Sequence, residues 1–236
     1  MKRISKTLLS LIYPTRCPYC NKIIKTDQVF CDECEVSFPV ISKIRSLDII
    51  DQREILCMSL FDYHSKVKSA IWSFKFRGKS EFSYNFSVKI VDCIRSSNMF
   101  NIKYDFITSV PMTFSRYVNR GYNQASLIGK DISKILNIPY KKLLKKIVNN
   151  KIQHTLNKNE RAKNVQGVYK AININNIKGK TILLCDDIVT TGNTLSECAR
   201  ILLNAGAEKV LCVTIADASK TIELIDDIWY IYNMIL

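Results

Sequence analysis

The sequence has no apolar run long enough to form a membrane-spanning helix. Among its 236 residues, no stretch approaches the roughly 18 to 20 apolar residues that a membrane span requires. The apolar run at residues 7–13 is short, and Pro14 follows it without a small-residue cleavage site, so we do not expect a signal peptide. We expect instead a cytoplasmic protein that begins with a short amphipathic helix, which packs on its own domain or touches a membrane or partner.

Histidine is scarce, acidic residues are outnumbered, and no internal repeat is visible. There are only two histidines, and nothing in the sequence indicates that His154 is catalytic. The formal net charge of +14 favours polyanionic partners such as nucleic acid, phosphorylated ligands or an anionic membrane face. Residues 113–163 hold 12 Lys and Arg but 2 Asp and Glu, a net charge of +10. A solvated, lysine-rich surface explains such a run equally well.

Cysteine, in contrast, is abundant, and four of the nine cysteines form a tight pattern. Cys17-Pro-Tyr-Cys20 and Cys31-Asp-Glu-Cys34 are two C-x2-C pairs separated by ten residues. Four thiolates at this spacing predict a closed tetrahedral site for structural Zn²⁺, with an iron–sulfur cluster or a redox pair as alternatives. The other five lie among apolar neighbours and are expected to be buried in a reducing compartment: Cys57, Cys93, Cys185, Cys198 and Cys212.

Hydrophobic periodicity predicts an α/β domain of ordinary size with a small appendage. We expect strands at 55–62, 105–110, 180–186 and 209–216, with a strand or bulge at 167–171. We expect helices at 66–75, 83–94, 123–136 and 193–205, a linker or first helix at 41–53, and polar segments at 141–164 and 173–180. The final strand, helix and strand imply a parallel pair with a right-handed crossover.

Residues 182–194, Ile-Leu-Leu-Cys-Asp-Asp-Ile-Val-Thr-Thr-Gly-Asn-Thr, carry the strongest chemical signal. An apolar strand delivers Asp186 and Asp187 at its carboxyl end, where open α/β sheets bind ligands. Gly192 allows a tight backbone approach to an anion, and successive N–H groups at a helix N-terminus attract phosphate. The donors that accompany it are Thr190, Thr191, Asn193 and Thr194. This combination predicts a loop that holds a ribose 5-phosphate.

The paired carboxylates at Asp186 and Asp187 suit the ribose hydroxyls, and at least one could help to hold Mg²⁺, which prefers oxygen ligands. A simple helix cap would need only one aspartate. The pattern resembles the phosphoribosyl-pyrophosphate motif of type I phosphoribosyltransferases. We therefore expect Asp186 and Asp187 to be the catalytic residues of any transferase activity.

Two further basic segments are candidates for anion binding. Arg116 and Arg120 lie four residues apart in a loop that Gly121 closes, and each guanidinium can grip phosphate oxygens in a bidentate manner. Arg116 is the candidate for pyrophosphate, although a basic loop without any ligand is the alternative. The candidates for binding a nucleic-acid backbone are Arg116, Arg120, Lys75, Arg77, Lys79 and Arg161. Phe76, Tyr117 and Tyr122 are candidates for base stacking, although such residues more often serve in packing.

The order of these segments resembles the ComF family, specifically the ComFC-type competence proteins. The resemblance rests on the N-terminal cysteine module, Lys75-Phe-Arg-Gly78, Val110-Pro-x5-Arg116-x3-Arg120-Gly-Tyr-Asn-Gln124, the 153–165 stretch and the 182–194 motif. It runs from about residue 8 to about residue 216. It implies a type I phosphoribosyltransferase-like, doubly wound parallel sheet with an N-terminal zinc ribbon. The expected units are residues 1–40, 41–216 and a tail at 217–236, to which the resemblance assigns no function.

The resemblance also implies a role in natural transformation. Family members assist the uptake of single-stranded DNA on the cytoplasmic side of the inner membrane, near the DNA channel and, in some bacteria, a helicase. Phosphoribosyl pyrophosphate, with Mg²⁺, is the implied ligand. The alternatives are an active phosphoribosyltransferase with an unidentified base or nucleotide-like acceptor, and a regulator that only senses the ligand. The sequence shows no clear base-binding set and no general base.

Overall fold

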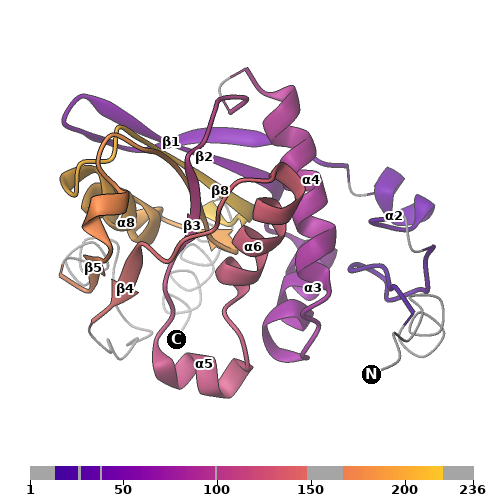
Figure 1. Ribbon diagram of the computed structural model, residues 1–236. Helices are drawn as coiled ribbons and strands as arrows, with labels where there is room; N and C mark the ends of the chain where they lie inside the picture. Colours follow the sequence, from indigo (N-terminus) through magenta and orange to yellow (C-terminus); the bar gives the residue numbers. More distant parts are fainter. Residues whose placement is uncertain (1–13, 26–27, 38, 99, 148–166, 220–236) are drawn as a thin grey trace, which may run out of the picture.

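The computed structural model of the chain describes residues 14–25, 28–37, 39–98, 100–147 and 167–219 (Figure 1). The helix expected at 7–13, Arg161 and residues 220–236 of the expected tail lie outside this part of the chain. The described elements, labelled as in Figure 1, are α2 (Asp32–Ser37), β1 (Lys43–Ile50), β2 (Arg53–Asp62), α3 (Ser65–Phe76), α4 (Phe82–Ser96), β3 (Phe106–Ser109), α5 (Phe114–Arg120), α6 (Gln124–Leu136), β4 (Leu144–Lys146), β5 (Tyr169–Ala171), η1 (Ile174–Asn176), β6 (Thr181–Cys185), β7 (Ile188–Val189), α8 (Asn193–Asn204) and β8 (Lys209–Asp217).

The main sheet has the strand order β1-β2-β8-β6-β3, and the short β7 pairs with β8. The strands β2, β8, β6 and β3 run parallel, which confirms the predicted parallel pairing of the last two long strands. β1 is antiparallel to β2 and forms one edge. β4 and β5 make a separate two-stranded sheet. The carboxyl ends of four parallel strands therefore meet at one edge of the main sheet.

Both faces of the sheet are buried, as the uniformly apolar strands predict. Along β6, Leu183 and Cys185 belong to one hydrophobic core, whereas Ile182 and Leu184 belong to the other. Residues of α3, α4 and α6 fill the first core, and residues of α8, β4 and β5 fill the second. Figure 1 shows the same arrangement, with α8 on one side of the sheet and α4 and α6 on the other. The doubly wound architecture is confirmed.

The cysteine module packs on the first core. Phe30 is buried, its ring stacks on Tyr19 with centroids 4.8 Å apart, and Tyr19 meets Phe61 of β2 edge-on at 5.8 Å. The Asn85 side-chain amide of α4 donates to the Val29 carbonyl at 2.5 Å. The module therefore shares apolar contacts with the α/β domain. Within the described residues, no helix is both long and apolar enough to span a bilayer.

Two expectations about local structure were wrong. Residues 43–50, expected as part of a linker or first helix, form the edge strand β1, whose register shifts between Ser46 and Asp48. This irregularity obscures the alternation of apolar side chains that marks a strand. The expected arginine loop is helical over Phe114–Arg120, with Thr113 as its N-cap and Gly121, at φ 78°, as its C-cap. The short strands β4 and β7 were not predicted from the sequence.

Candidate functional site

The predicted phosphate loop follows β6 at the carboxyl edge of the sheet. The backbone N–H of Asp186 donates to the Val213 carbonyl at 3.0 Å, and the carbonyl of Asp187 accepts from the Ile215 N–H at 3.0 Å. Both bonds join the loop to the central strand β8. Residues Ile188–Val189 then form β7, which extends the pairing with β8. The loop is thus held by main-chain hydrogen bonds on one side along its first four residues.

The second half of the loop turns into α8 and encloses a small cavity of 50 Å³. Gly192 has a φ of 89°, in the left-handed region that side chains disfavour. A Cβ at this position would also approach Leu47 Cδ2 to 3.0 Å. The cavity is lined by Asp186, Ile188 and the run from Val189 to Leu195. Its position at the N-terminus of a twelve-residue helix gives it the partial positive charge that phosphate requires.

The two aspartates of the loop lie in different environments. The Asp187 carboxylate forms an ion pair with Lys75 of α3, with Oδ2 and Nζ 3.0 Å apart and side chains 15% and 17% exposed. The Asp186 Oδ1 accepts from the backbone N–H of Asp187 at 2.8 Å. Burial, followed by the negative charge of Asp187, raises the pKa of Asp186 to about 8. A cationic ligand at this position would offset the repulsion between the two carboxylates.

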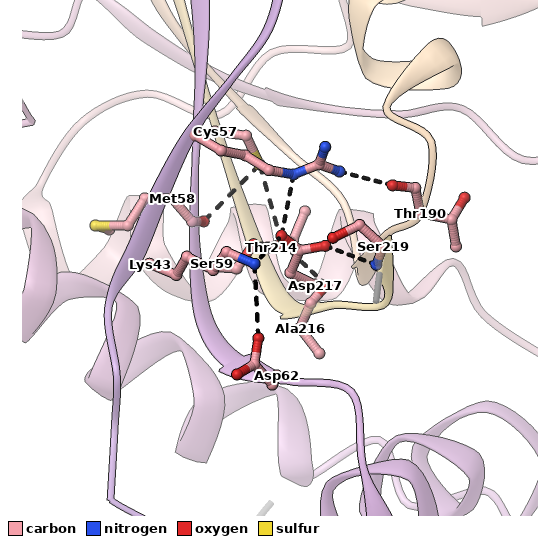
Figure 2. A network of polar contacts seen from close by, with 11 residues as sticks. Lys43, Cys57, Met58, Ser59, Asp62, Thr190, Thr214, Ala216, Asp217 and Ser219 are labelled. Carbon is pink, nitrogen blue, oxygen red and sulfur yellow. Dashed lines mark hydrogen bonds and ion pairs between the residues drawn. The ribbon is translucent and has the colours of Figure 1, made fainter. Parts of the chain in front are cut away.

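Arg45 of β1 also anchors the loop, and sequence reasoning missed it. Its Nη2 donates to the Thr190 carbonyl at 2.6 Å, while its Nε lies 3.0 Å from Asp217 Oδ2. Lys43 lies 3.1 Å from the same carboxylate oxygen. Asp217, whose side chain is 1% exposed, also accepts from the Ser219 N–H at 2.9 Å (Figure 2). Since Arg45 is 145 residues from Thr190, no local pattern could have identified this contact.

Arg116 lies half-buried on α5, and its positive charge acts on Lys146 of β4 and Tyr169 of β5. Lys146 Nζ lies 5.4 Å from the centroid of the Tyr169 ring. Burial lowers the pKa of Lys146, and the positive charge of Arg116 lowers it further. Burial raises the pKa of Tyr169, whose neighbours include Asp186 and Thr194. The structure therefore brings Arg116 into the electrostatic surroundings of the phosphate loop.

Arg77 and Arg120 each lie over one exposed aromatic ring of α3. The Arg77 guanidinium lies 4.8 Å from the Trp72 ring, and the Arg120 guanidinium lies 4.8 Å from the Phe76 ring. The two rings are 5.8 Å apart, and they are 47% and 56% exposed. We call these four residues the arginine–aromatic ladder. Trp72 was not among the predicted stacking residues, although its position four residues before Phe76 on a helix places both rings on one face.

The ladder adjoins the phosphate loop. Lys75, which precedes Phe76, is the partner of Asp187. Burial lowers the pKa of Arg120, and the nearby Asp187 carboxylate raises it. Of the other predicted residues, Lys79 lies 3.7 Å from Glu81, and Tyr122 donates its hydroxyl to the Phe74 carbonyl at 2.5 Å. Tyr122 therefore serves in packing, whereas Tyr117 is half exposed on α5.

The four predicted zinc ligands come together. The Sγ atoms of Cys17, Cys20, Cys31 and Cys34 all lie within 4.8 Å of one another, and those of Cys20 and Cys31 are 3.6 Å apart. A tetrahedral Zn²⁺ with Zn–S bonds of about 2.3 Å requires S–S separations of about 3.8 Å. The cluster therefore has the size of a closed zinc site. The other five cysteines are buried, as expected.

Comparison with protein families agrees with both parts of the structure. The phosphoribosyl transferase domain matches residues 123–236, and the double zinc ribbon domain matches residues 8–45. The second match includes all four clustered cysteines, which supports zinc as the metal. Together with the parallel sheet and its phosphate loop, these matches confirm the predicted phosphoribosyltransferase-like α/β fold with an N-terminal zinc-ribbon module.

Three curated relatives match this chain over different lengths. Competence protein ComFC of Bacillus subtilis is 30% identical over 198 residues, which cover 80% of this chain and 72% of the relative. Competence protein F of Haemophilus influenzae is 32% identical over 106 residues, 44% of this chain and 46% of the relative, so less than half of that protein is matched. DNA utilization protein YhgH of Escherichia coli is 26% identical over 208 residues, 84% of this chain and 90% of the relative.

Proposed function

Because this chain belongs to the ComF family of competence proteins, we propose that it acts in natural transformation by binding incoming single-stranded DNA beside a phosphoribosyl-pyrophosphate site. The names of its relatives, which refer to competence and to DNA utilization, support the process. The phosphoribosyl transferase domain supports the ligand. Two sets of residues carry the two binding activities.

The arginine–aromatic ladder is the observation that carries the DNA-binding proposal. Proteins that bind single strands without sequence preference stack bases on aromatic rings and neutralise phosphates with nearby cations. Trp72 and Phe76 offer exposed rings, and Arg77 and Arg120 lie over their faces. The further proposed contacts to DNA phosphates are Lys75, Lys79 and Arg116. Arg161, which lies outside the described residues, is proposed as well. A DNA strand bound to this surface would pass close to Asp187, the ion-pair partner of Lys75.

The phosphate loop is the proposed site for phosphoribosyl pyrophosphate. Backbone N–H groups of the segment Thr190–Thr194 would hold the 5-phosphate, and Asp186 and Asp187 would accept from the ribose hydroxyls. Arg116 would contact the pyrophosphate. The carboxylates at the carboxyl end of β6 also fit the oxygen ligands that Mg²⁺ prefers, and Mg²⁺ would neutralise pyrophosphate charge when bound.

The ladder can be tested by measuring the affinity for a fluorescent oligothymidylate in Trp72→Ala/Phe76→Ala. Because stacking is worth about 1–3 kcal/mol per base, we expect at least a tenfold loss of affinity without a change in salt dependence. Arg77→Gln should instead reduce the slope of log affinity against log salt by about 0.7. Tyr84→Ala, which removes another exposed ring on α4, is the matched control. Equal affinities for the double variant and the control would refute the ladder as the DNA surface.

The phosphate site can be tested separately by calorimetry. Asp186→Asn/Asp187→Asn should abolish binding of phosphoribosyl pyrophosphate, whereas the ladder variant should retain it. Circular dichroism and thermal melting would check that the double variant is folded. Unchanged ligand binding in the double variant would rule out this site assignment.

We further propose a cytoplasmic position at the inner membrane, near the DNA channel or a helicase of the uptake machinery, in keeping with the family resemblance. We also propose the division into residues 1–40, 41–216 and 217–236; β1 starts at Lys43, close to the first boundary, and β8 ends at Asp217, one residue past the second. Transfer of the 5-phosphoribosyl group to an acceptor, with pyrophosphate as the leaving group, is the second hypothesis. Pyrophosphate release that requires a free base or single-stranded DNA, and does not occur with water alone, would establish it.

A further inference from the structure

A second, larger cavity of 550 Å³ lies at the outer edge of the sheet, between the end of β3, α5, α6 and β4. Small-molecule sites usually occupy about 300–1,000 Å³, so its size suits a ligand such as a nucleotide. It shares no lining residue with the cavity of the phosphate loop. None of the activities proposed above uses it.

Three hydroxyl groups form a connected cluster in the wall of this cavity. The Tyr140 hydroxyl lies 2.8 Å from Ser109 Oγ and 3.0 Å from Ser126 Oγ. Each hydroxyl carries one O–H donor and two acceptor lone pairs. The two contacts use two of the three O–H donors, so one donor and several lone pairs are left for another partner. The cluster thus offers a donor and acceptors to the polar edge of a ligand.

Four lysines also line the cavity: Lys130, Lys142, Lys145 and Lys146. The cavity lining includes no aspartate or glutamate. No carboxylate in the described part of the chain forms an ion pair with any of the four. Four uncompensated positive charges around a concave surface raise the local concentration of an anion.

Phe114 and Tyr117 of α5 supply aromatic surface to the same cavity, and they are 79% and 50% exposed. A phenyl ring as exposed as Phe114 gains little from the core of its own chain, whereas it can stack on a flat partner. The cavity therefore combines aromatic surface, a hydroxyl cluster and a lysine group. A planar base with hydrogen-bonding edges, joined to a phosphate, matches all three.

We propose that this cavity binds one nucleotide. The base contacts Phe114 and Tyr117 and reaches the Ser109–Tyr140–Ser126 hydroxyls, and the phosphate lies among the lysines. The nucleotide is either a free nucleoside monophosphate or one unit of a DNA strand. The second case deepens the proposed function and rests on it, whereas the first does not.

Calorimetry with thymidine, thymidine 5′-monophosphate and a ten-residue oligothymidylate tests the site. No other sugar phosphate is added, because its phosphate would compete for the same lysines. The variants are Lys142→Gln/Lys145→Gln for the lysines and Ser126→Ala for the hydroxyls. Lys103→Gln/Lys209→Gln, at two exposed lysines outside the cavity, is the matched control.

The monophosphate should bind at least tenfold more tightly than thymidine, and Lys142→Gln/Lys145→Gln should remove that advantage. Ser126→Ala should weaken both ligands by the same factor. Binding of the monophosphate identifies a free nucleotide as a ligand. A loss confined to the oligothymidylate identifies a nucleotide of the strand.

If Lys142→Gln/Lys145→Gln binds the monophosphate and the oligothymidylate as tightly as the control does, the proposal is overturned. Failure of the DNA-binding proposal has a different signature, because Trp72→Ala/Phe76→Ala would then leave oligothymidylate affinity unchanged. Monophosphate binding does not depend on the ladder, so it decides the free-nucleotide case whatever the result for DNA.

Discussion

Replacing Arg45 with methionine should destabilise the protein and loosen the phosphate loop. Arg45 is the one side chain among the described contacts of Asp217 that also holds the Thr190 carbonyl. The substitution keeps much of the apolar stem and removes the charge and all of its donors. This single change removes both the hydrogen bond to the Thr190 carbonyl and the ion pair with Asp217.

The magnitude follows from what remains around Asp217. Removing one partner of a buried ion pair costs about 3–5 kcal/mol when the other charge is left uncompensated. Here Lys43 and the Ser219 N–H still contact the carboxylate, so the loss is closer to that of the one charged hydrogen bond that Arg45 donates to the Thr190 carbonyl. We therefore expect a decrease of about 2–3 kcal/mol in the free energy of unfolding, or roughly 30- to 150-fold in the folded-to-unfolded ratio.

Urea denaturation measures this decrease, and calorimetry with phosphoribosyl pyrophosphate measures the effect on the loop. Arg45→Lys should recover most of the stability, because a lysine can still pair with Asp217. It should not recover ligand affinity, since one ammonium lacks the fork that reaches both Asp217 and Thr190. Arg95→Met, on the exposed end of α4, is the control. If Arg45→Met is no more destabilising than this control, Arg45 does not anchor the loop.

Two further predictions concern the metal module and the pH dependence of the anchor. Purified protein should contain one Zn²⁺ per chain by metal analysis, and Cys20→Ser should lose both the metal and stability whereas Cys93→Ser keeps the metal; iron in place of zinc would contradict the zinc assignment. The pKa of Asp217 lies below its usual range, because burial raises it but the Ser219 backbone and hydroxyl, Arg45 and Lys43 together lower it by more. Its stabilising contribution is therefore present above pH of about 4 and lost as the pH falls through the folded-state pKa, so the deficit of Asp217→Asn in urea denaturation should shrink between pH 7 and pH 3; a constant deficit would refute this.

Much of the fold could be predicted from the sequence, because its signals are local. The apolar strand before Asp186 and the glycine at position 192 predict the strand, turn and helix start of the proposed phosphate loop without knowledge of the rest of the chain. The apolar faces of α3, α4, α6 and α8 repeat at helical spacing. The paired C-x2-C motifs bring four ligands together whatever surrounds them. In each case a short segment contains both the structural and the chemical information.

The features that were missed depend on distant parts of the chain. β1 became recognisable as a strand only from its pairing with β2, since its own pattern is interrupted at Ser46 and Asp48. Arg45 acquired its role from Thr190 and Asp217, which lie more than 140 residues away. The helix α5 was missed for another reason. It has seven residues, too few for a periodic apolar face, although its Thr113 N-cap was a usable signal.

The position of β8 has a consequence for how the protein is made. This strand is the last of the described elements in sequence, yet it lies between β2 and β6. In the parallel register of β2 and β8, Cys212 lies opposite Cys57. During synthesis the two halves of the sheet therefore have no central strand until the ribosome has passed Asp217. Such late, long-range closure slows folding and leaves strand edges exposed. A nascent chain that has reached Thr194 carries the whole phosphate motif, but it cannot yet hold that motif in shape.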